Sequence, residues 1–310
     1  MSIRIGVIGV GYLGRHHARI YSSLVGVALF GVADTDGDKA KEIAASYGCR
    51  PFLNYKDLLA HCDAVSIVTP TTTHFEIAMD CLKAGKDVLI EKPITSGLQE
   101  GEDLVKEAAS GNLILQVGHL ERYNPGVVAA SGMIREPWFV EAERLSPFTG
   151  RGTDVDVTLD LMIHDIDIVT SIVQSKVVDI RAAGQRVLTK KIDLAKVWLE
   201  FENGCKAMIT ASRLSPEKQR RLMVFQKDSF FSVDYQNGEV RHYFEDGRDM
   251  SVDIVKPEIR EPLKEELEDF IQCVKARRRP KVSGREALDA LQIVMKINQI
   301  VSDGELQGLR

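Results

Sequence analysis

The chain has 310 residues, of which 44% are hydrophobic and 27% are charged, and it carries a formal net charge of −5 at pH 7. This composition is ordinary for a globular protein, and the length suits two domains of about 150 residues each. The negative charge argues against a broad nucleic-acid or membrane surface, so we expect neither partner. The longest apolar run, residues 24–33, is shorter than the roughly 18 residues that span a bilayer.

We expect no targeting signal at the N-terminus, because residues 3–8 already have the apolar pattern of a β-strand. The five cysteines are odd in number, scattered and never spaced as CxxC; they are Cys49, Cys62, Cys81, Cys205 and Cys273. This pattern predicts reduced thiols, not disulfides or zinc ligands, and favours the cytoplasm. His16 and His17 would point about 100° apart on a helix, so they cannot chelate one ion, and we predict no metal.

Strand and helix patterns alternate through the first 120 residues. The predicted strands cover residues 3–8, 27–33, 64–68, 87–90 and 113–117, and the predicted helices cover residues 14–22, 38–47, 73–84 and 98–110. Gly48, Gly85 and Gly111 follow the last three helices at the position where glycine ends a helix. Short apolar strands separated by amphipathic helices predict a buried parallel sheet with helices on both faces, so residues 1–120 form a doubly wound Rossmann domain.

The pattern changes after Gly118. Predicted strands follow one another at residues 139–145, 177–185, 196–201, 205–212, 221–225, 230–234 and 239–243, interrupted by one helix at about 157–173. Asn124-Pro125 opens a short helix, and Glu202-Asn203-Gly204 predicts a hairpin turn. Residues 121–310 are therefore predicted to form an α+β domain with a large, mostly antiparallel open sheet. Two helices close the chain and are candidates for packing back on the first domain.

The segment Gly9-Val10-Gly11-Tyr12-Leu13-Gly14 has the pattern GxGxxG, follows the first strand and opens a helix. In a dinucleotide-binding turn, Gly9 would allow the tight bend, Gly11 the approach of a pyrophosphate, and Gly14 close packing of helix on strand. The helix N-terminus, with Tyr12 and Leu13 beside it, would offer N–H groups to the phosphates.

Asp34 ends the second strand, 20 positions after Gly14. A carboxylate there accepts hydrogen bonds from the ribose hydroxyls and repels a 2′-phosphate, so NAD is favoured over NADP. The alternative is a structural glycine turn with Asp34 as a helix cap. The loop with Thr69, Pro70, Thr71 and His74 follows the predicted strand at 64–68 and should line the cofactor. Helix capping by Thr71 or Thr72 explains the threonine hydroxyls equally well.

Two further groups carry chemistry. Glu91-Lys92-Pro93 follows the strand at 87–90, and Asp160, His164 and Asp167 share one face of the helix at 157–173. A histidine could take the alkoxide proton that hydride transfer releases, a carboxylate could orient the imidazole, and Lys92 could bind the alkoxide. The alternatives are a buried pair that ties the helix to its sheet, and a solvated charge for Lys92.

These motifs together resemble the glucose–fructose oxidoreductase/inositol dehydrogenase (Gfo/Idh/MocA) family over essentially the whole chain. The resemblance implies that Lys92, Asp160 and His164 are catalytic, that Glu91 and Lys92 border the cofactor, and that the Lys92-Pro93 peptide is cis. It also implies that residues 116–125 pass the nicotinamide, with Tyr123 in contact with substrate, and that the open sheet forms a homodimer or homotetramer. Met162 departs from the small residue that many members carry between the aspartate and the histidine.

Members of the family act mostly on sugars, cyclitols and sugar nucleotides, and this sequence is similar to the subgroup that oxidises the 3-hydroxyl of UDP-N-acetylglucosamine. Arg151 and Arg213 could bind a diphosphate; solvated loop charge is the alternative. Two other functions stay open: a reductase of a non-sugar carbonyl, and a non-catalytic NAD-sensing regulator. The presence of all three residues Lys92, Asp160 and His164 argues against the regulator.

Overall fold

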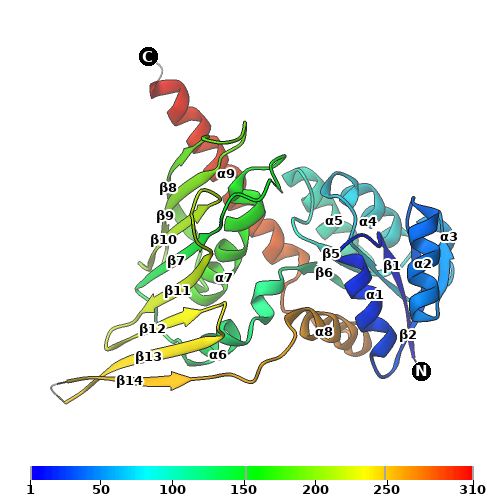
Figure 1. Cartoon of the computed structure of the whole chain (residues 1–310), viewed down its shortest axis with the longest axis horizontal. Coiled ribbons are helices and arrows are strands. Elements are labelled where there is room, and N and C mark those ends of the chain that lie inside the picture. Colours follow the sequence, from blue (N-terminus) through cyan, green and yellow to red (C-terminus); the bar gives the residue numbers. More distant parts are fainter. Residues whose placement is uncertain (1, 151, 248, 309–310) are drawn as a thin grey trace. The chain divides into compact units, whose positions relative to one another are not determined.

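The computed structural model describes residues 2–150, 152–247 and 249–308. The chain divides into two compact units (Figure 1). The first contains Met1–Leu120 and Glu261–Asp289, and the second contains Glu121–Arg260 and Ala290–Arg310. The first closing helix, α8 (Pro262–Ala276), therefore belongs to the first unit, whereas the long helix α9 (Gly284–Gly308) contributes to both.

The first unit contains a six-stranded parallel sheet in the order β3-β2-β1-β4-β5-β6. Its strands are β1 (Ile3–Ile8), β2 (Val27–Ala33), β3 (Arg50–Phe52), β4 (Ala64–Ile67), β5 (Asp87–Glu91) and β6 (Leu115–Gly118). Its helices are α1 (Gly14–Ser23), α2 (Gly37–Tyr47), α3 (Tyr55–Leu59), α4 (His74–Lys83), α5 (Leu98–Ser110) and α8. This is the Rossmann order, and its direction reverses between β1 and β4, the point at which such sheets bind ligands.

Helix α8 belongs to the first unit because its apolar side is part of that core. Leu267 and Phe270 are fully buried in the cluster that includes Ile5 of β1 and Tyr21 of α1. Burying side chains of this size contributes about 1.5–3 kcal/mol each, which is enough to hold a helix that is distant in sequence against the sheet.

The second unit contains an eight-stranded sheet in the order β14-β13-β12-β11-β7-β10-β9-β8, in which β7 and β10 form the one parallel pair. Its strands are β7 (Phe139–Leu145), β8 (Val177–Gln185), β9 (Leu194–Phe201), β10 (Lys206–Ser212), β11 (Gln219–Phe225), β12 (Ser229–Asp234), β13 (Glu239–Asp246) and β14 (Asp249–Val255). Its helical segments include α6 (Pro125–Met133) and α7 (Ile163–Val173). The predicted fold class, a Rossmann sheet followed by a mostly antiparallel sheet, is confirmed.

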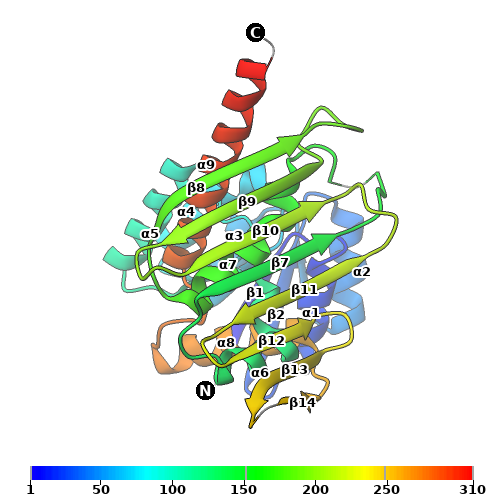
Figure 2. The same ribbon diagram turned by 90° about the vertical axis from the view of Figure 1, so that its left-hand side faces the viewer.

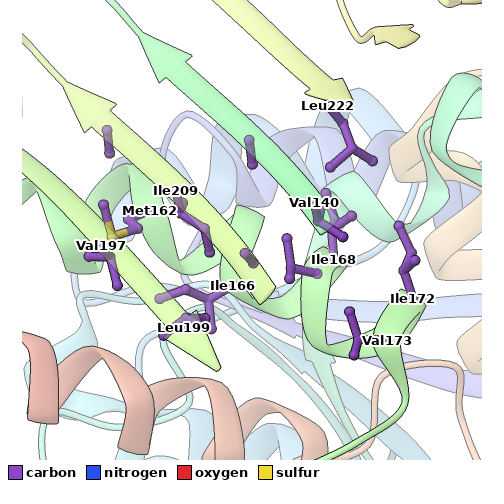
Figure 3. Packing of buried hydrophobic residues seen from close by; sticks show 14 of the residues in the cluster. Val140, Met162, Ile166, Ile168, Ile172, Val173, Val197, Leu199, Ile209 and Leu222 are labelled. Carbon is purple, nitrogen blue, oxygen red and sulfur yellow. The ribbon is translucent and has the colours of Figure 1, made fainter. Parts of the chain in front are cut away.

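Helix α7 packs on one face of the eight-stranded sheet. Ile166 and Ile168 of this helix are fully buried with Val140, Val197 and Leu199 of the strands (Figure 3). Period-two alternation along the strands sends these side chains inward and leaves the next ones half-exposed. Among the described helices of the second unit, none covers the opposite face of the sheet, which Figure 2 shows.

Several predicted details were wrong. The helix at 157–173 begins as a π-helical turn, η3 (Thr158–Met162), before α7 starts. Gly111 does end α5, as predicted, but it is right-handed, and the following Asn112 takes the positive φ of 50°. The edge strands β3 and β14 were missed, since three residues that include a proline, and a strand with two aspartates, carry weak strand signals. Of the helices described, none is both long and apolar enough to cross a membrane.

Candidate active site

The glycine turn after β1 has the geometry that a dinucleotide requires. Gly9 has a φ of +86°, and a Cβ there would lie 2.5 Å from the Val68 carbonyl oxygen. A Cβ on Gly14 would lie 1.9 Å from the Gly9 carbonyl oxygen, whereas one on Gly11 would meet nothing within 4 Å. The first and third glycines are thus needed for packing, and the second leaves its backbone open to a ligand. Tyr12 beside it is 79% exposed.

Asp34 lies beside this turn at the end of β2. One carboxylate oxygen accepts the Val10 backbone N–H at 2.8 Å, and the other accepts the Asp36 N–H at 2.9 Å. Asp34 is not a helix cap, because the cap of α2 is Asp36, which accepts from the backbone of Asp38 and Lys39. Each carboxylate oxygen has a second acceptor site, so the residues present fit the adenosine ribose of a bound NAD.

The loop after β4 contains Thr69, Pro70 and Thr71. The Thr73 hydroxyl oxygen lies 2.8 Å from the Thr69 hydroxyl oxygen and 2.8 Å from the Pro70 carbonyl oxygen, and these contacts close the loop on itself. Thr73 is the N-cap of α4 but makes no side-chain capping bond, and Pro70 caps the short 3-10 turn η1 (Thr71–Thr73). Capping by Thr71 or Thr72 therefore does not explain the hydroxyls of this loop.

His74 was predicted to contact the cofactor, and the structure gives it another environment. Its ring is 1% exposed, with Nδ1 at 2.9 Å from the Pro93 carbonyl oxygen and Nε2 at 2.9 Å from the Thr69 carbonyl oxygen. Burial lowers the pKa of His74, against the effect of these carbonyls and of Glu91. Both ring nitrogens are occupied, so His74 links two loops and does not present a nitrogen to a ligand.

Glu91 ends β5, and the following Lys92-Pro93 peptide is cis, as the resemblance implied. The Glu91 carboxylate lies 3.2 Å from His17 Nε2. A Cβ on Gly118 would come within 2.8 Å of that carboxylate, so the glycine leaves room for it. His17 is fully buried, and its Nδ1 lies 3.3 Å from the Ser66 hydroxyl. Sequence reasoning considered His17 only as a metal ligand and missed this buried polar group.

Asp160 and His164 lie on the helical segment of the second unit. Asp160 is in the π turn, and such turns are frequent at functional sites. Its carboxylate packs against Gly152, where a Cβ would lie 2.8 Å from Oδ2. Asp167, the third residue of the predicted polar face, is 2% exposed and accepts from Arg122 at 3.2 Å. Among the described side chains, no group of three or more His, Cys, Asp or Glu is arranged to hold a metal ion.

Sequence analysis missed a charge cluster around the buried pair of Arg144 and Asp165, the residue that follows His164 in the chain. Arg144 of β7 donates to both carboxylate oxygens of Asp165, at 2.7 and 2.9 Å, and to Glu121 at 2.8 Å. Arg220 also donates to Glu121, at 3.0 Å. The sequence did carry a signal for it. Arg144 follows the buried Ala142 by two residues, so the alternation along β7 places its side chain on the same inward face.

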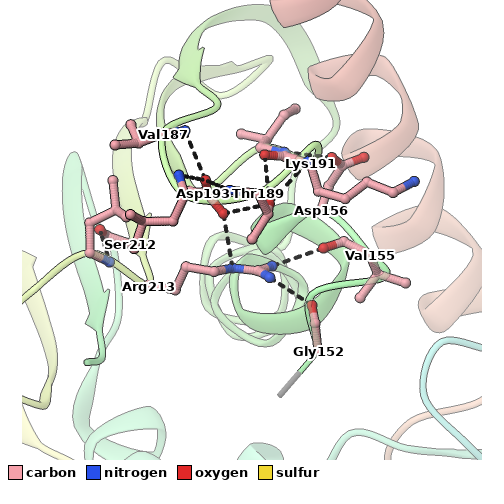
Figure 4. Close-up of polar contacts among 12 residues, drawn as sticks. Gly152, Val155, Asp156, Val187, Thr189, Lys191, Asp193, Ser212 and Arg213 are labelled. Carbon is pink, nitrogen blue, oxygen red and sulfur yellow. Dashed lines mark hydrogen bonds and ion pairs between the residues drawn. The ribbon is translucent and has the colours of Figure 1, made fainter. Parts of the chain in front are cut away.

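The predicted substrate contacts fall in different surroundings. Tyr123 is 5% exposed, and Arg151 lies outside the described residues. Arg213 is 4% exposed, and its guanidinium donates to the carbonyls of Gly152 and Val155 (Figure 4). A solvated loop cation, which was the alternative for Arg213, is therefore excluded. A role as a diphosphate ligand would require Arg213 to give up these bonds.

The comparisons with known proteins identify the class of protein. Residues 3–119 match a family model described as an oxidoreductase family with an NAD-binding Rossmann fold, and residues 102–231 match the model of the GFO/IDH/MocA C-terminal domain. The chain belongs to the Gfo/Idh/MocA oxidoreductase family. It is thus an NAD-dependent oxidoreductase, as the glycine motif and Asp34 predicted.

Individual relatives are similar over nearly the whole chain. The UDP-N-acetylglucosamine 3-dehydrogenase of Acidithiobacillus ferrooxidans is 40% identical, over 93% of this chain and 95% of its own. A solved structure of that enzyme, GnnA, superposes with a TM-score of 0.92 at 38% identity, covering 97% of this chain and 98% of its own. The scyllo-inositol 2-dehydrogenase (NAD(+)) of Bacillus subtilis is 27% identical, over 94% of this chain and 92% of its own.

Proposed function

We propose that this protein oxidises the 3-hydroxyl of UDP-N-acetylglucosamine to a ketone, with NAD+ as the hydride acceptor. The observation that carries the proposal is the 40% identity, over 93% of the chain, to a UDP-N-acetylglucosamine 3-dehydrogenase. The inositol dehydrogenases are less similar, at 27% for the Bacillus subtilis enzyme. A sugar nucleotide is therefore favoured over a free cyclitol as substrate.

The catalytic roles go to Lys92, Asp160 and His164. Bound NAD+ supplies the acceptor for the hydride that leaves the carbinol carbon. His164 takes the proton of the hydroxyl, since an imidazole has a pKa near neutrality. Asp160 orients the imidazole and stabilises its protonated form. Lys92 donates a hydrogen bond to the oxygen as negative charge develops on it.

The cofactor is proposed to contact three parts of the first unit. The pyrophosphate would meet the turn of Gly9, Gly11 and Gly14 at the start of α1, where the helix dipole favours negative charge. The adenosine ribose would bind Asp34. The loop from Thr69 to Thr71 and the Glu91-Lys92 segment follow β4 and β5 at the carboxyl edge of the sheet, where doubly wound folds place the rest of a dinucleotide.

The first test is NADH formation by the purified protein with NAD+ and a panel of UDP-N-acetylglucosamine, other UDP-sugars, free hexoses and inositols. Turnover confined to UDP-N-acetylglucosamine is expected. Turnover of inositols alone would mean that the proposed substrate is wrong and that the enzyme class is right. No turnover of any compound, with NAD+ bound normally, would refute the proposal and favour a non-sugar carbonyl substrate or an NAD-sensing regulator.

Two variants test the catalytic roles. His164→Ala and Lys92→Ala should each lower kcat at least about 100-fold, the usual scale for a lost acid–base group, while NAD+ still binds. The matched controls are His61→Ala and Lys83→Ala, which change exposed residues of the first unit. Normal turnover in either catalytic variant would contradict its assignment.

We also propose that the open face of the eight-stranded sheet joins copies of this chain into a dimer or tetramer. Aromatic rings line that face, with centroids 5.5 Å apart for Phe225 and Phe230 and 4.3 Å apart for Phe230 and Tyr243. Phe230→Lys should reduce the mass measured by analytical ultracentrifugation, whereas Val25→Lys, at a position 96% exposed on the first unit, should not.

The five free cysteines support a cytoplasmic location.

A further inference from the structure

Arg213 follows strand β10 and holds a loop in the second unit. Its Nη1 donates to the Gly152 carbonyl oxygen at 2.6 Å, and its Nη2 donates to the Val155 carbonyl oxygen at 2.9 Å (Figure 4). The side chain is only 5% exposed. Both acceptors lie in the loop that leads into the π turn, which carries Asp160.

This loop is in direct contact with Asp160. Gly152 has a φ of +64°, and a Cβ added to it would lie 2.8 Å from Asp160 Oδ2 and 3.3 Å from its carboxyl carbon. The carboxylate therefore packs against the Gly152 backbone. Arg213 binds the carbonyl of Gly152. Its guanidinium therefore fixes the position of the backbone against which the Asp160 carboxylate packs.

Arg213 is itself fixed from the other side by Asp193. Oδ1 of Asp193 lies 3.8 Å from Nε of Arg213. The backbone N–H of Arg213 also donates to the backbone carbonyl oxygen of Asp193, at 3.0 Å. Burial alone would raise the pKa of Asp193, but hydrogen bonds from the backbone of Thr189, Val187 and Leu188 and from the Thr189 hydroxyl lower it. Asp193 is thus an ionised, rigid partner for the guanidinium.

A second set of bonds holds the other end of the loop. Asp156 Oδ1 accepts the Ile192 N–H at 2.8 Å, and the Val157 N–H donates to the Ile192 carbonyl at 2.9 Å. Ile192 thus anchors the start of the π turn, while Arg213 anchors the preceding loop. The fork of the guanidinium suits this task, since it can bind two carbonyls in a fixed geometry where a lysine offers a single centre.

We propose that Arg213 is a positioning residue, which holds Asp160 in place through the Gly152 backbone and thereby sets the basicity of His164. The inference rests on the proposed roles of Asp160 and His164, and it replaces the predicted role of Arg213 as a diphosphate ligand. A carboxylate near an imidazole stabilises the protonated form and raises the histidine pKa. Loss of Arg213 frees the loop, displaces the carboxylate and lowers the pKa of His164.

The first experiment needs no substrate. The pKa of His164 is measured by NMR in protein labelled with 15N-histidine, with His164→Gln to assign the resonance. Arg213→Met should lower this pKa by about 0.5–1 unit, a fraction of the full effect of a neighbouring charge, and Arg213→Lys should lie between wild type and Arg213→Met. Arg181→Met is the matched control, because Arg181 is 68% exposed in the same unit. An unchanged pKa of His164 in Arg213→Met would overturn the proposal.

The second experiment separates positioning from substrate binding. With UDP-N-acetylglucosamine, Arg213→Met should lower kcat about 10-fold and move the acid limb of its pH profile to lower pH, with KM changed less than about threefold. A large rise in KM with an unchanged kcat and pH profile would make Arg213 a substrate ligand and refute the positioning role. If the wild type does not turn over this substrate, the proposed function fails, while the NMR result still decides the role of Arg213.

Folding of the variants is checked by circular dichroism. Arg213→Met should fold, because the Asp193 carboxylate keeps its hydrogen bonds from Val187, Leu188 and Thr189. If Arg213→Met does not fold, Gly152→Ala serves as the second variant. It disturbs the contact between the Gly152 backbone and Asp160 directly, since its methyl group would lie 2.8 Å from Asp160 Oδ2. Gly152→Ala should shift the pKa of His164 although Arg213 is intact, and no shift would overturn the proposal.

Discussion

Replacing Arg144 by methionine should destabilise the second unit by about 3–5 kcal/mol, the usual cost of removing one partner of a buried ion pair. Arg144 is 1% exposed and makes two short bonds to Asp165, which is fully buried. Methionine fills much of the same volume but leaves the Asp165 carboxylate without the cation that donates hydrogen bonds to it. The variant thus isolates the electrostatic loss from the loss of packing.

The pH dependence of this loss gives a second check. Burial raises the pKa of Asp165, and Arg144 opposes that rise. Without Arg144 the folded-state pKa lies above the unfolded value of about 3.9, so the unfolded state releases its proton first as pH rises. The stability of Arg144→Met should therefore fall as pH rises through the folded pKa, and the deficit against wild type should be larger at pH 8 than at pH 5.

Guanidinium unfolding followed by tryptophan fluorescence reports on this unit alone, because the two tryptophans of the chain, Trp138 and Trp198, both lie in it. The double variant Arg144→Met/Asp165→Leu should recover most of the loss, since an apolar pair needs no compensation. A loss below about 1 kcal/mol in the single variant, or no recovery in the double variant, would refute this account of the cluster.

Three further predictions concern the first unit. Gly14→Ala places a methyl group 1.9 Å from the Gly9 carbonyl oxygen, so NADH titration by fluorescence should show at least a tenfold loss of affinity; unchanged affinity would mean that the turn relaxes freely. Asp34→Ser should weaken NAD+ binding and narrow its preference over NADP+, measured as the ratio of dissociation constants; an unaltered ratio would contradict the ribose contact. Because burial lowers the pKa of His74 below its unfolded value of about 6.5, the stability that this residue contributes should be fully present above pH 6.5 and decline as pH falls toward the folded pKa. Unfolding free energies of wild type and His74→Gln should therefore converge on acidification from pH 8 to pH 5, and a constant difference would count against it.

Much of this protein follows from local pattern. The glycine turn, the acidic end of β2 and the alternation of short apolar strands with helices predicted the Rossmann unit, because each depends on backbone geometry within a few residues. Period-two alternation likewise predicted most strands of the second sheet. The weakly patterned edge strands β3 and β14, and the π turn at Thr158–Met162, escaped this reasoning because neighbouring strands and loops define them.

The partners of polar side chains were decided by tertiary structure. His74 and Arg213 were predicted to face ligands. Instead, the ring nitrogens of His74 face backbone carbonyls. The guanidinium of Arg213 donates to the carbonyl of Gly152, which is 61 residues away in the chain. Composition and spacing mark a residue as able to form hydrogen bonds, and they do not say which carbonyls lie within 3 Å of it. Buried polar groups must be satisfied inside the protein, so loop packing far along the chain determines which of them remain available for chemistry.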